Sequence, residues 1–269
     1  MLGLSLSSKI DSPKEPYNAS SCIVFNATDV AYCSAITSFK DIPPPHASAN
    51  SSLIRGNIFA NNFTMFTWVK FASGDYAKPI ITWTESNNVG MQLYIDASEN
   101  LVFRMDTTEA TGSTTLSTGT WYHIVVTYND TTNTMKVYLN GSEELSNTSL
   151  DYDGEASGDS GYFYLGYNGN LADDGSRYLN GRIFEWGTYA QALSAAEATA
   201  AYNGGDPMDM RHLAVSGSLG LVNWYTFGDK PTDEAVKAYD FSRQLDSYML
   251  GANAMVLNNT TYASDAPSS

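Results

Sequence analysis

Cysteine, positive charge and long apolar runs are all scarce in this chain of 269 residues. Only 14 lysines and arginines stand against 29 aspartates and glutamates, which gives a formal net charge of −15. This balance argues against a nucleic-acid-binding surface, because neutralising phosphates requires clustered Lys and Arg. No apolar run approaches the ~18 residues of a membrane-spanning helix, so no membrane partner is expected. The acidity reflects either solubility or the binding of divalent cations.

The two cysteines, Cys22 and Cys33, leave two alternatives open. They flank a short apolar stretch and could form a disulfide across a hairpin. They could equally be two buried thiols, because cysteine packs well in a core. Residues 1–9 lack a basic segment followed by a sustained apolar one, so no secretion signal is predicted. Synthesis in a reducing compartment would favour the thiols.

What the chain has instead is a series of short runs rich in β-branched and aromatic residues, separated by turn residues. These runs cover residues 63–71, 80–83, 91–95, 101–105, 121–128, 135–139, 162–167, 178–186 and 221–227. The run Phe63–Phe71 is apolar on both faces, which is typical of a central strand covered on both sides. One helix is predicted near 194–203, where Ser194 and Glu197 match a capping box. The pattern predicts an all-β, antiparallel β-sandwich with one short helix.

Three ordered motifs resemble those of laminin-G-like domains in the concanavalin A-like lectin/glucanase superfamily. They are the strand Trp121–Tyr128, the hairpin Val137–Gly141 with its Asn-Gly turn, and the segment Gly181–Glu197. The resemblance implies a concanavalin A-like jelly roll and by itself selects no activity, because one fold hosts many functions. We expect an N-terminal arm at 1–20, a single laminin-G-like domain with a strand extension at 21–257, and a flexible tail at 258–269.

The search for catalytic residues gives mostly negative results. Glucanases of the superfamily carry a Glu-x-Asp-x-x-Glu strand that places two carboxylates at one glycosidic bond, and this string is absent. The segment Gly158–Gly161 resembles the surroundings of a serine protease nucleophile, with His123 as the conceivable base. His123 alternates within an apolar strand, however, so a structural role fits it better. No phosphate loop, zinc pair or haem motif is present, and we expect the chain not to be an enzyme.

Acidic and amide side chains gather in two loops that could bind calcium, the one cofactor that the pattern suggests. Calcium prefers about six to eight oxygen ligands, which close-set turns can supply. Many laminin-G-like domains hold calcium at a loop rim, and the resemblance implies the same here. The candidate ligands are Asp151, Asp153, Asp159, Asn168, Asn170, Asp173 and Asp174. Solvated acidic turns are the alternative.

Tyrosines near these loops are candidates for carbohydrate binding, because an aromatic ring can stack on a pyranose face while polar groups fix the hydroxyls. The candidates are Tyr152, Tyr162, Tyr164, Tyr167 and Tyr178. The alternative is that these rings pack between the sheets and pair across strands.

The expected role is that of a non-enzymatic structural protein of a virion surface, either a capsid decoration or a tail-associated protein. The strings Met1–Leu6 and Leu221–Asp229 resemble phage structural proteins that carry this domain, and release by lysis needs no secretion signal. Residues 1–20 would contact other virion proteins, and the chain could form homo-oligomers. The alternative is a glycan-binding adhesin for host attachment. A glycosidase fragment or accessory carbohydrate module ranks third, because the paired carboxylates are absent.

Overall fold

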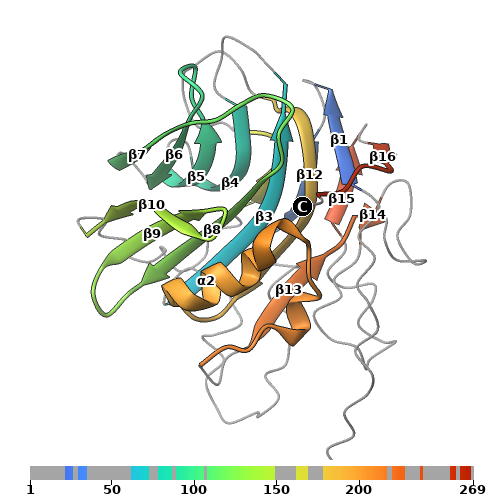
Figure 1. Cartoon of the computed structure of the whole chain (residues 1–269). Helices are drawn as coiled ribbons and strands as arrows, with labels where there is room; N and C mark the ends of the chain where they lie inside the picture. Colours follow the sequence, from blue (N-terminus) through green and yellow to red (C-terminus); the bar gives the residue numbers. More distant parts are fainter. Residues whose placement is uncertain are drawn as a thin grey trace, which may run out of the picture.

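The computed structural model describes most of the chain between Cys22 and Pro267, with gaps. The described residues are 22–26, 30–34, 62–72, 78–86, 89–105, 108–148, 162–168, 178–216, 220–227, 237–238, 255–258 and 261–267. Within them the chain forms two antiparallel sheets and one α-helix (Figure 1). The predicted antiparallel β-sandwich with one short helix is therefore confirmed.

The first sheet, sheet A, has the strand order β10-β9-β8-β3-β12-β1-β16, and β13 pairs with the part of β12 that β1 leaves open. Its strands are β1 (Cys22–Asn26), β3 (Phe63–Phe71), β8 (Tyr122–Asn129), β9 (Thr134–Leu139), β10 (Ser142–Asn147), β12 (Asn180–Tyr189), β13 (Leu221–Tyr225) and β16 (Thr261–Ala263). Strands β1 and β16 lie on the side of the molecule opposite β7 and β10 (Figure 1).

The second sheet, sheet B, has the order β14-β15-β2-β11-β4-β5-β6-β7. Its strands are β2 (Val30–Ser34), β4 (Lys78–Ser86), β5 (Val89–Ile95), β6 (Asn100–Met105), β7 (Thr108–Thr115), β11 (Tyr162–Leu165), β14 (Lys237–Ala238) and β15 (Met255–Asn258).

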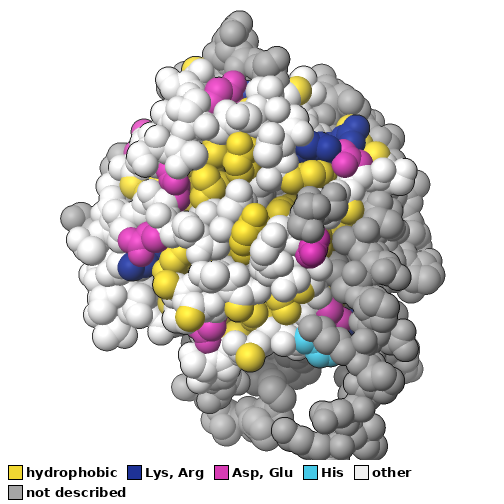
Figure 2. All heavy atoms as spheres, viewed as in Figure 1, with side chains coloured by type: hydrophobic (Ala, Val, Ile, Leu, Met, Phe, Trp, Pro, Cys, Tyr) yellow, Lys and Arg dark blue, Asp and Glu magenta, His cyan; other side chains and the backbone are white. Residues whose placement is uncertain are grey.

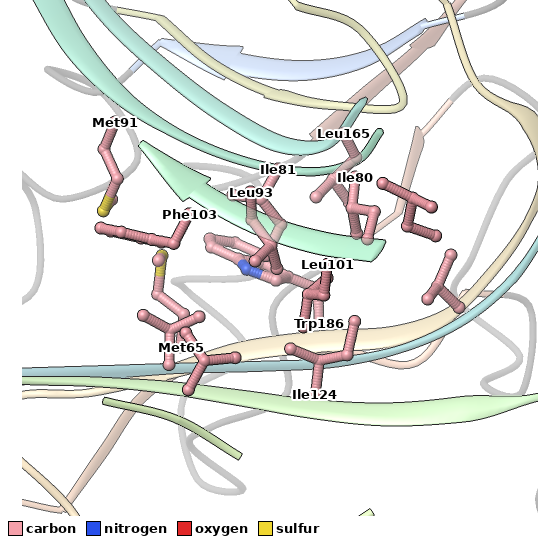
Figure 3. Packing of buried hydrophobic residues seen from close by; sticks show 14 of the residues in the cluster. Met65, Ile80, Ile81, Met91, Leu93, Leu101, Phe103, Ile124, Leu165 and Trp186 are labelled. Carbon is pink, nitrogen blue, oxygen red and sulfur yellow. The ribbon is translucent and has the colours of Figure 1, made fainter. Parts of the chain in front are cut away.

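The core lies between the two sheets and is built from alternate residues of their strands. Figure 3 shows Met65, Ile124 and Trp186 of sheet A packed toward Leu93 and Phe103 of sheet B. All five are almost fully buried. Burying each such side chain contributes about 1.5–3 kcal/mol, so this layer is the main stabilising feature of the fold.

Strand β3 is buried on both faces, as its sequence predicts. Its second face is covered by helix α2 (Ala195–Tyr202) and by the 3₁₀ turn η3 (Met210–His212), and the 3₁₀ turn η2 (Asn203–Gly205) directly follows α2. The residues of this second cluster are Phe66, Val125, Tyr138, Tyr189, Leu193, Ala198, Ala201, Met210, Leu213 and Trp224. Sheet A is thus covered by the other sheet on one side and by these short helices on the other.

Helix α2 begins with the predicted capping box. The hydroxyl of Ser194 accepts a hydrogen bond from the backbone N–H of Glu197, and the Glu197 carboxylate accepts one from the backbone N–H of Ser194 at 2.7 Å. The helix ends at Asn203, whose φ of 50° is left-handed. No helix in the described part of the chain is both long and apolar enough to cross a membrane.

The predicted Asn-Gly turn joins β9 to β10 and docks against α2. Asn140 and Gly141 both have positive φ, 49° and 77°, which is the geometry of a type I′ turn. The Thr199 hydroxyl of α2 donates a hydrogen bond to the Gly141 carbonyl at 2.7 Å. The turn residues of the family motif therefore also fix the position of the helix.

Residues 261–267 differ from the flexible tail expected at 258–269. Thr261–Ala263 form β16 and pair with β1, and Asp265 makes ion pairs with Lys70 and Arg182. A strand of three residues carries too little sequence pattern to be predicted, because its partners lie far away in the sequence. The expected arm at 1–20 lies outside the described residues.

Candidate functional site

The outer face of sheet B, which points away from the core, carries polar and aromatic side chains. In β5, Met91, Leu93 and Ile95 face the core, so Gln92 and Tyr94 face outward. Strand β6 follows the same rule, because Leu101, Phe103 and Met105 face inward and leave Val102 and Arg104 outside. The alternation of the two strands therefore builds a second surface opposite the core.

Cross-strand pairing places five of these outward residues in one row, which we call the outer row. Tyr164 of β11 is opposite Thr82 of β4, and Thr82 is opposite Gln92 of β5. Gln92 is opposite Arg104 of β6, which is opposite Glu109 of β7. Adjacent strands lie ~4.8 Å apart, so the row from Tyr164 to Arg104 is about 14 Å long.

Three tyrosines gather where the chain leaves β11 and returns toward β12, and we call them the tyrosine cluster. The rings of Tyr164 and Tyr167 meet edge to face with centroids 5.2 Å apart. The rings of Tyr167 and Tyr178 stack with centroids 5.0 Å apart, and the same two residues form a β-bridge. All three side chains are partly exposed, which leaves ring surface accessible at this rim.

The structure thus brings together Tyr164, Tyr167 and Tyr178 from the predicted carbohydrate-binding set. Their mutual ring contacts also match the alternative interpretation, in which aromatic rings pair with one another. Tyr162 belongs to β11, but its side chain is outside the described part, and Tyr152 lies outside it altogether. The candidate site therefore rests on three of the five predicted tyrosines.

Some polar groups of the outer face already have interaction partners within the protein. The Tyr94 hydroxyl donates a hydrogen bond to Glu109 Oε1 at 3.1 Å, and Arg104 Nε lies 3.9 Å from the same oxygen. Tyr94 packs against Val102, and these residues are only 9% and 2% exposed. The accessible part of the face is consequently confined to the tyrosine cluster and to the end with Arg104 and Glu109.

Asn168 directly follows Tyr167 of the tyrosine cluster. It is the one predicted calcium ligand within the described residues. It is 4% exposed, and its Oδ1 has no hydrogen-bond partner among the described residues. The other candidates, Asp151, Asp153, Asp159, Asn170, Asp173 and Asp174, lie outside them. The described segments contain no group of three or more His, Cys, Asp or Glu that could hold a metal ion. The calcium site stays a prediction.

His123 is fully buried beneath α2, away from the outer face of sheet B. Its ring lies 4.7 Å from that of Trp68 and 6.1 Å from that of Tyr202. Burial lowers the pKa of His123 to about 3, so the imidazole is neutral. Neither ring nitrogen of His123 has a hydrogen-bond partner among the described residues, and ring packing holds the side chain in its structural role. Ser160, the serine of the protease-like segment Gly158–Gly161, lies outside the described residues.

The outer row includes four residues that the sequence analysis did not single out: Thr82, Gln92, Arg104 and Glu109. The available signal was the period of two in β5 and β6, which places Gln92 and Arg104 opposite the core residues. The alignment of the whole outer row, from Tyr164 to Glu109, depends on the register of five strands, which the sequence does not reveal.

Solved structures of similar fold include proteins of different kinds. A candidate carbohydrate-binding protein from Bacteroides ovatus is 18% identical with a TM-score of 0.62, and the match covers 95% of this chain and 63% of that protein. A heptameric pentraxin from Limulus polyphemus is 13% identical with a TM-score of 0.50, covering 76% of this chain and 92% of that one. At these identities the likeness shows the fold alone.

A Trypanosoma rangeli sialidase is 15% identical with a TM-score of 0.44, and the match covers 56% of this chain and 24% of the enzyme. That likeness is too distant to bear on activity. Among curated proteins, no relative matches the chain. A laminin-G-type sequence family, described as the concanavalin A-like lectin/glucanases superfamily, matches residues 46–199, more than half of the chain. The chain belongs to the concanavalin A-like lectin/glucanase superfamily, through a laminin-G-type domain.

Proposed function

We propose that this protein is a non-catalytic carbohydrate-binding module whose site is the tyrosine cluster of Tyr164, Tyr167 and Tyr178. The observation that carries the proposal is the meeting of three partly exposed rings at one rim, beside a row of polar side chains. The apolar face of a sugar ring stacks on an aromatic ring, and its hydroxyls need fixed polar partners.

The length of the outer row indicates an oligosaccharide. Tyr164 and Arg104 stand at opposite ends of about 14 Å of sheet, three strand spacings apart. A single sugar ring cannot reach both. Because Thr82 and Gln92 between them are 0% and 8% exposed, a short chain of sugars would contact the row at its two accessible ends. Membership of a lectin-containing superfamily supports the proposal, as does the similar fold of the Bacteroides ovatus protein, of which this chain spans 63%.

The absence of catalysis is part of the proposal. Glycoside hydrolysis by the usual mechanisms requires two carboxyl groups on either side of the scissile bond. Glu109 is the one acidic side chain of the outer row, and it already accepts a hydrogen bond from Tyr94. The sequence also lacks the paired-carboxylate string of the glucanases.

A glycan array probed with the full chain tests the binding proposal. We expect binding to oligosaccharides and little binding to the corresponding monosaccharides. An array that stays silent, with and without calcium, would contradict carbohydrate binding.

Calcium is the cation that we propose for the loop that begins at Asn168. The buried Oδ1 of Asn168, which lacks a partner among the described residues, is the kind of oxygen that calcium binds. The remaining predicted ligands are the acidic and amide residues of loops 151–159 and 170–174. An ion bound there would hold the loop against the tyrosine cluster.

Calcium is expected to raise the melting temperature of the wild-type chain, and a chelator should reverse the shift, because a ligand of the folded state stabilises it. Asn168→Ala should reduce the shift, whereas Asn180→Ala, at an exposed residue two positions after Tyr178, should preserve it. Calorimetric titration measures the binding directly. Equal shifts in all three proteins would contradict a role for Asn168.

A purely structural role on a virion surface is the second candidate. It rests on the resemblance of Met1–Leu6 and Leu221–Asp229 to phage structural proteins, since Thr82 and Val102 on the outer face, 0% and 2% exposed, are covered by the chain itself. The supporting phage-like string Leu221–Asp229 includes β13, which completes sheet A beside β12. In this setting residues 1–20 would attach the domain to other virion proteins.

Imaging of native particles separates the candidates. Many copies spread over a shell would indicate a decoration protein, and a few copies at a tail would indicate a receptor-binding module. Normal incorporation of a chain lacking residues 1–20 would contradict attachment through that arm.

A further inference from the structure

Two positive charges face each other on the outer face of sheet A. Lys70 of β3 and Arg182 of β12 are directly paired across the strands. Like charges in this position destabilise a sheet unless an anion lies between them. Burial lowers the pKa of Lys70, and the charge of Arg182 lowers it further. Figure 2 shows that basic side chains are few on the visible face and lie beside acidic ones.

Asp265 supplies the anion. Its carboxylate makes ion pairs with both Lys70 and Arg182, and these interactions are charge-assisted hydrogen bonds. The indole N–H of Trp121 points at the same carboxylate, with Nε1 and Oδ1 3.4 Å apart. Lys70 Nζ also lies 5.0 Å from the centre of the Trp121 ring. The two cations and the indole therefore form one carboxylate-binding site.

The segment that carries Asp265, residues 261–267, lies on sheet A as an added piece, and we call it the strap. Its first three residues form the edge strand β16 and pair with β1, where Ala263 is opposite Cys22. The Asp265 N–H then donates to the Ala263 carbonyl at 3.0 Å, which turns the chain back over the sheet. Ala266 packs against the aromatic cluster that contains Trp121.

The strap is therefore held by the interactions with which proteins bind extended peptides: backbone pairing at a sheet edge, small apolar side chains on aromatic rings, and an ion-paired carboxylate. Cys22 adds a weak hydrogen bond from its thiol to the Ala263 carbonyl, at 3.6 Å. Within the described residues, β16 pairs with no strand other than β1. If the strap left the sheet, it would therefore lose few contacts outside this site.

We propose that the edge of β1, together with Lys70, Arg182 and Trp121, is a docking site for an extended segment that carries a carboxylate side chain. The strap fills this site within one chain, and the strap of a second copy of this chain can fill it in exchange. An open β1 would present unpaired backbone groups, and an edge of this kind accepts another strand. Exchange of identical elements is a low-cost route to association, because every native contact is remade between copies. Because the strap of this chain pairs with its own β1, the identical strap of a second copy is the matching partner.

A labelled synthetic peptide of residues 258–269 stands in for the strap of a second copy. We expect it to bind full-length Asp265→Asn, in which the resident strap is loosened, at least tenfold more tightly than it binds the wild-type chain. A control peptide with asparagine at position 265 should bind at least tenfold more weakly than the wild-type peptide. Absence of binding, or equal affinity of the two peptides, would overturn the proposal.

Hydrogen exchange of the wild-type chain gives a second test that needs no substitution. Raising the salt from about 0.05 M to about 0.5 M weakens ion pairs, so the amides of 261–263 should exchange several-fold faster. Those of β3 and β12 should be unchanged. If exchange accelerates equally in the strap and in β3 and β12, or in neither, the ion pairs of Asp265 stabilise the whole sheet and the strap does not exchange between copies.

Discussion

Glu197 shows how a single buried carboxylate couples the stability of this fold to pH. Burial works to raise its pKa, but hydrogen bonds from Ser194 and Ser216 outweigh burial and lower the pKa from 4.5 to about 2. A carboxyl group with a lowered pKa stabilises the folded state above its unfolded pKa. That stabilisation should be lost as the pH falls from 4.5 toward 2.

Glu197→Gln removes this charge and is expected to lower the free energy of unfolding at neutral pH by roughly 1–3 kcal/mol. Urea denaturation at about pH 7 and about pH 3 measures the difference, which should shrink at the lower pH. The exposed Glu143, paired with Lys136, provides the control. Glu143→Gln should change stability by less than ~0.5 kcal/mol. A constant Glu197→Gln effect at both pH values would contradict the assignment.

Gly187 is required by the close packing of β3, β12 and β13. A Cβ at this position would lie 2.4 Å from the Phe66 ring and 2.6 Å from the Asn223 carbonyl oxygen. Gly187→Ala is therefore expected to destabilise the fold by about 1–3 kcal/mol or more, through overpacking. Gly220→Ala is a matched control, because a Cβ there would meet no atom within 4 Å. Thermal denaturation compares the two, and equal melting temperatures would contradict the packing described.

At the scale of elements, Glu144 joins the edges of the two sheets where β10 passes β7. Its carboxylate accepts hydrogen bonds from the backbone N–H and the hydroxyl of Thr114, both at 2.7 Å. A Cβ at Gly112 would clash with the Glu144 side chain, so glycine makes room for it. One side chain thus occupies a backbone donor that an edge strand would otherwise expose.

Glu144→Ala should accelerate hydrogen exchange in β7 several-fold, while exchange in β3 and β12 stays slow. The cost in global stability is expected to be modest, about 0.5–1.5 kcal/mol, because the site is near the surface. Glu143→Ala, one residue away, should leave β7 unchanged. Protection of β7 that survives Glu144→Ala would show that other contacts hold the two edges together.

For the whole molecule, the sequence predicts the fold because its local signals agree with one another. The apolar faces of Phe63–Phe71, the turn at Asn140 and Gly141, and the capping box at Ser194 all take the predicted geometry. The strap could not be predicted, since the cations that hold Asp265 lie 195 and 83 residues away in the sequence.

The candidate site was predictable only in part. Tyr164 and Tyr167 are near neighbours in sequence, so their contact follows from the end of β11. Tyr178 joins them because the chain returns to form a bridge with Tyr167, a pairing that tertiary structure decides. Gln92 and Arg104 could be assigned to an outward face, but their alignment with Tyr164 follows from strand register.

The affinity of Tyr167→Leu for the oligosaccharide that the wild-type chain binds best tests the central claim most directly. This change keeps the bulk of the side chain and removes the flat ring at the centre of the tyrosine cluster. Calorimetry should show a loss of about tenfold, which corresponds to ~1.4 kcal/mol. Tyr122→Leu, in sheet A, should bind like the wild-type chain. Undiminished binding by Tyr167→Leu, or an equal loss in both variants, would contradict a carbohydrate site at the tyrosine cluster.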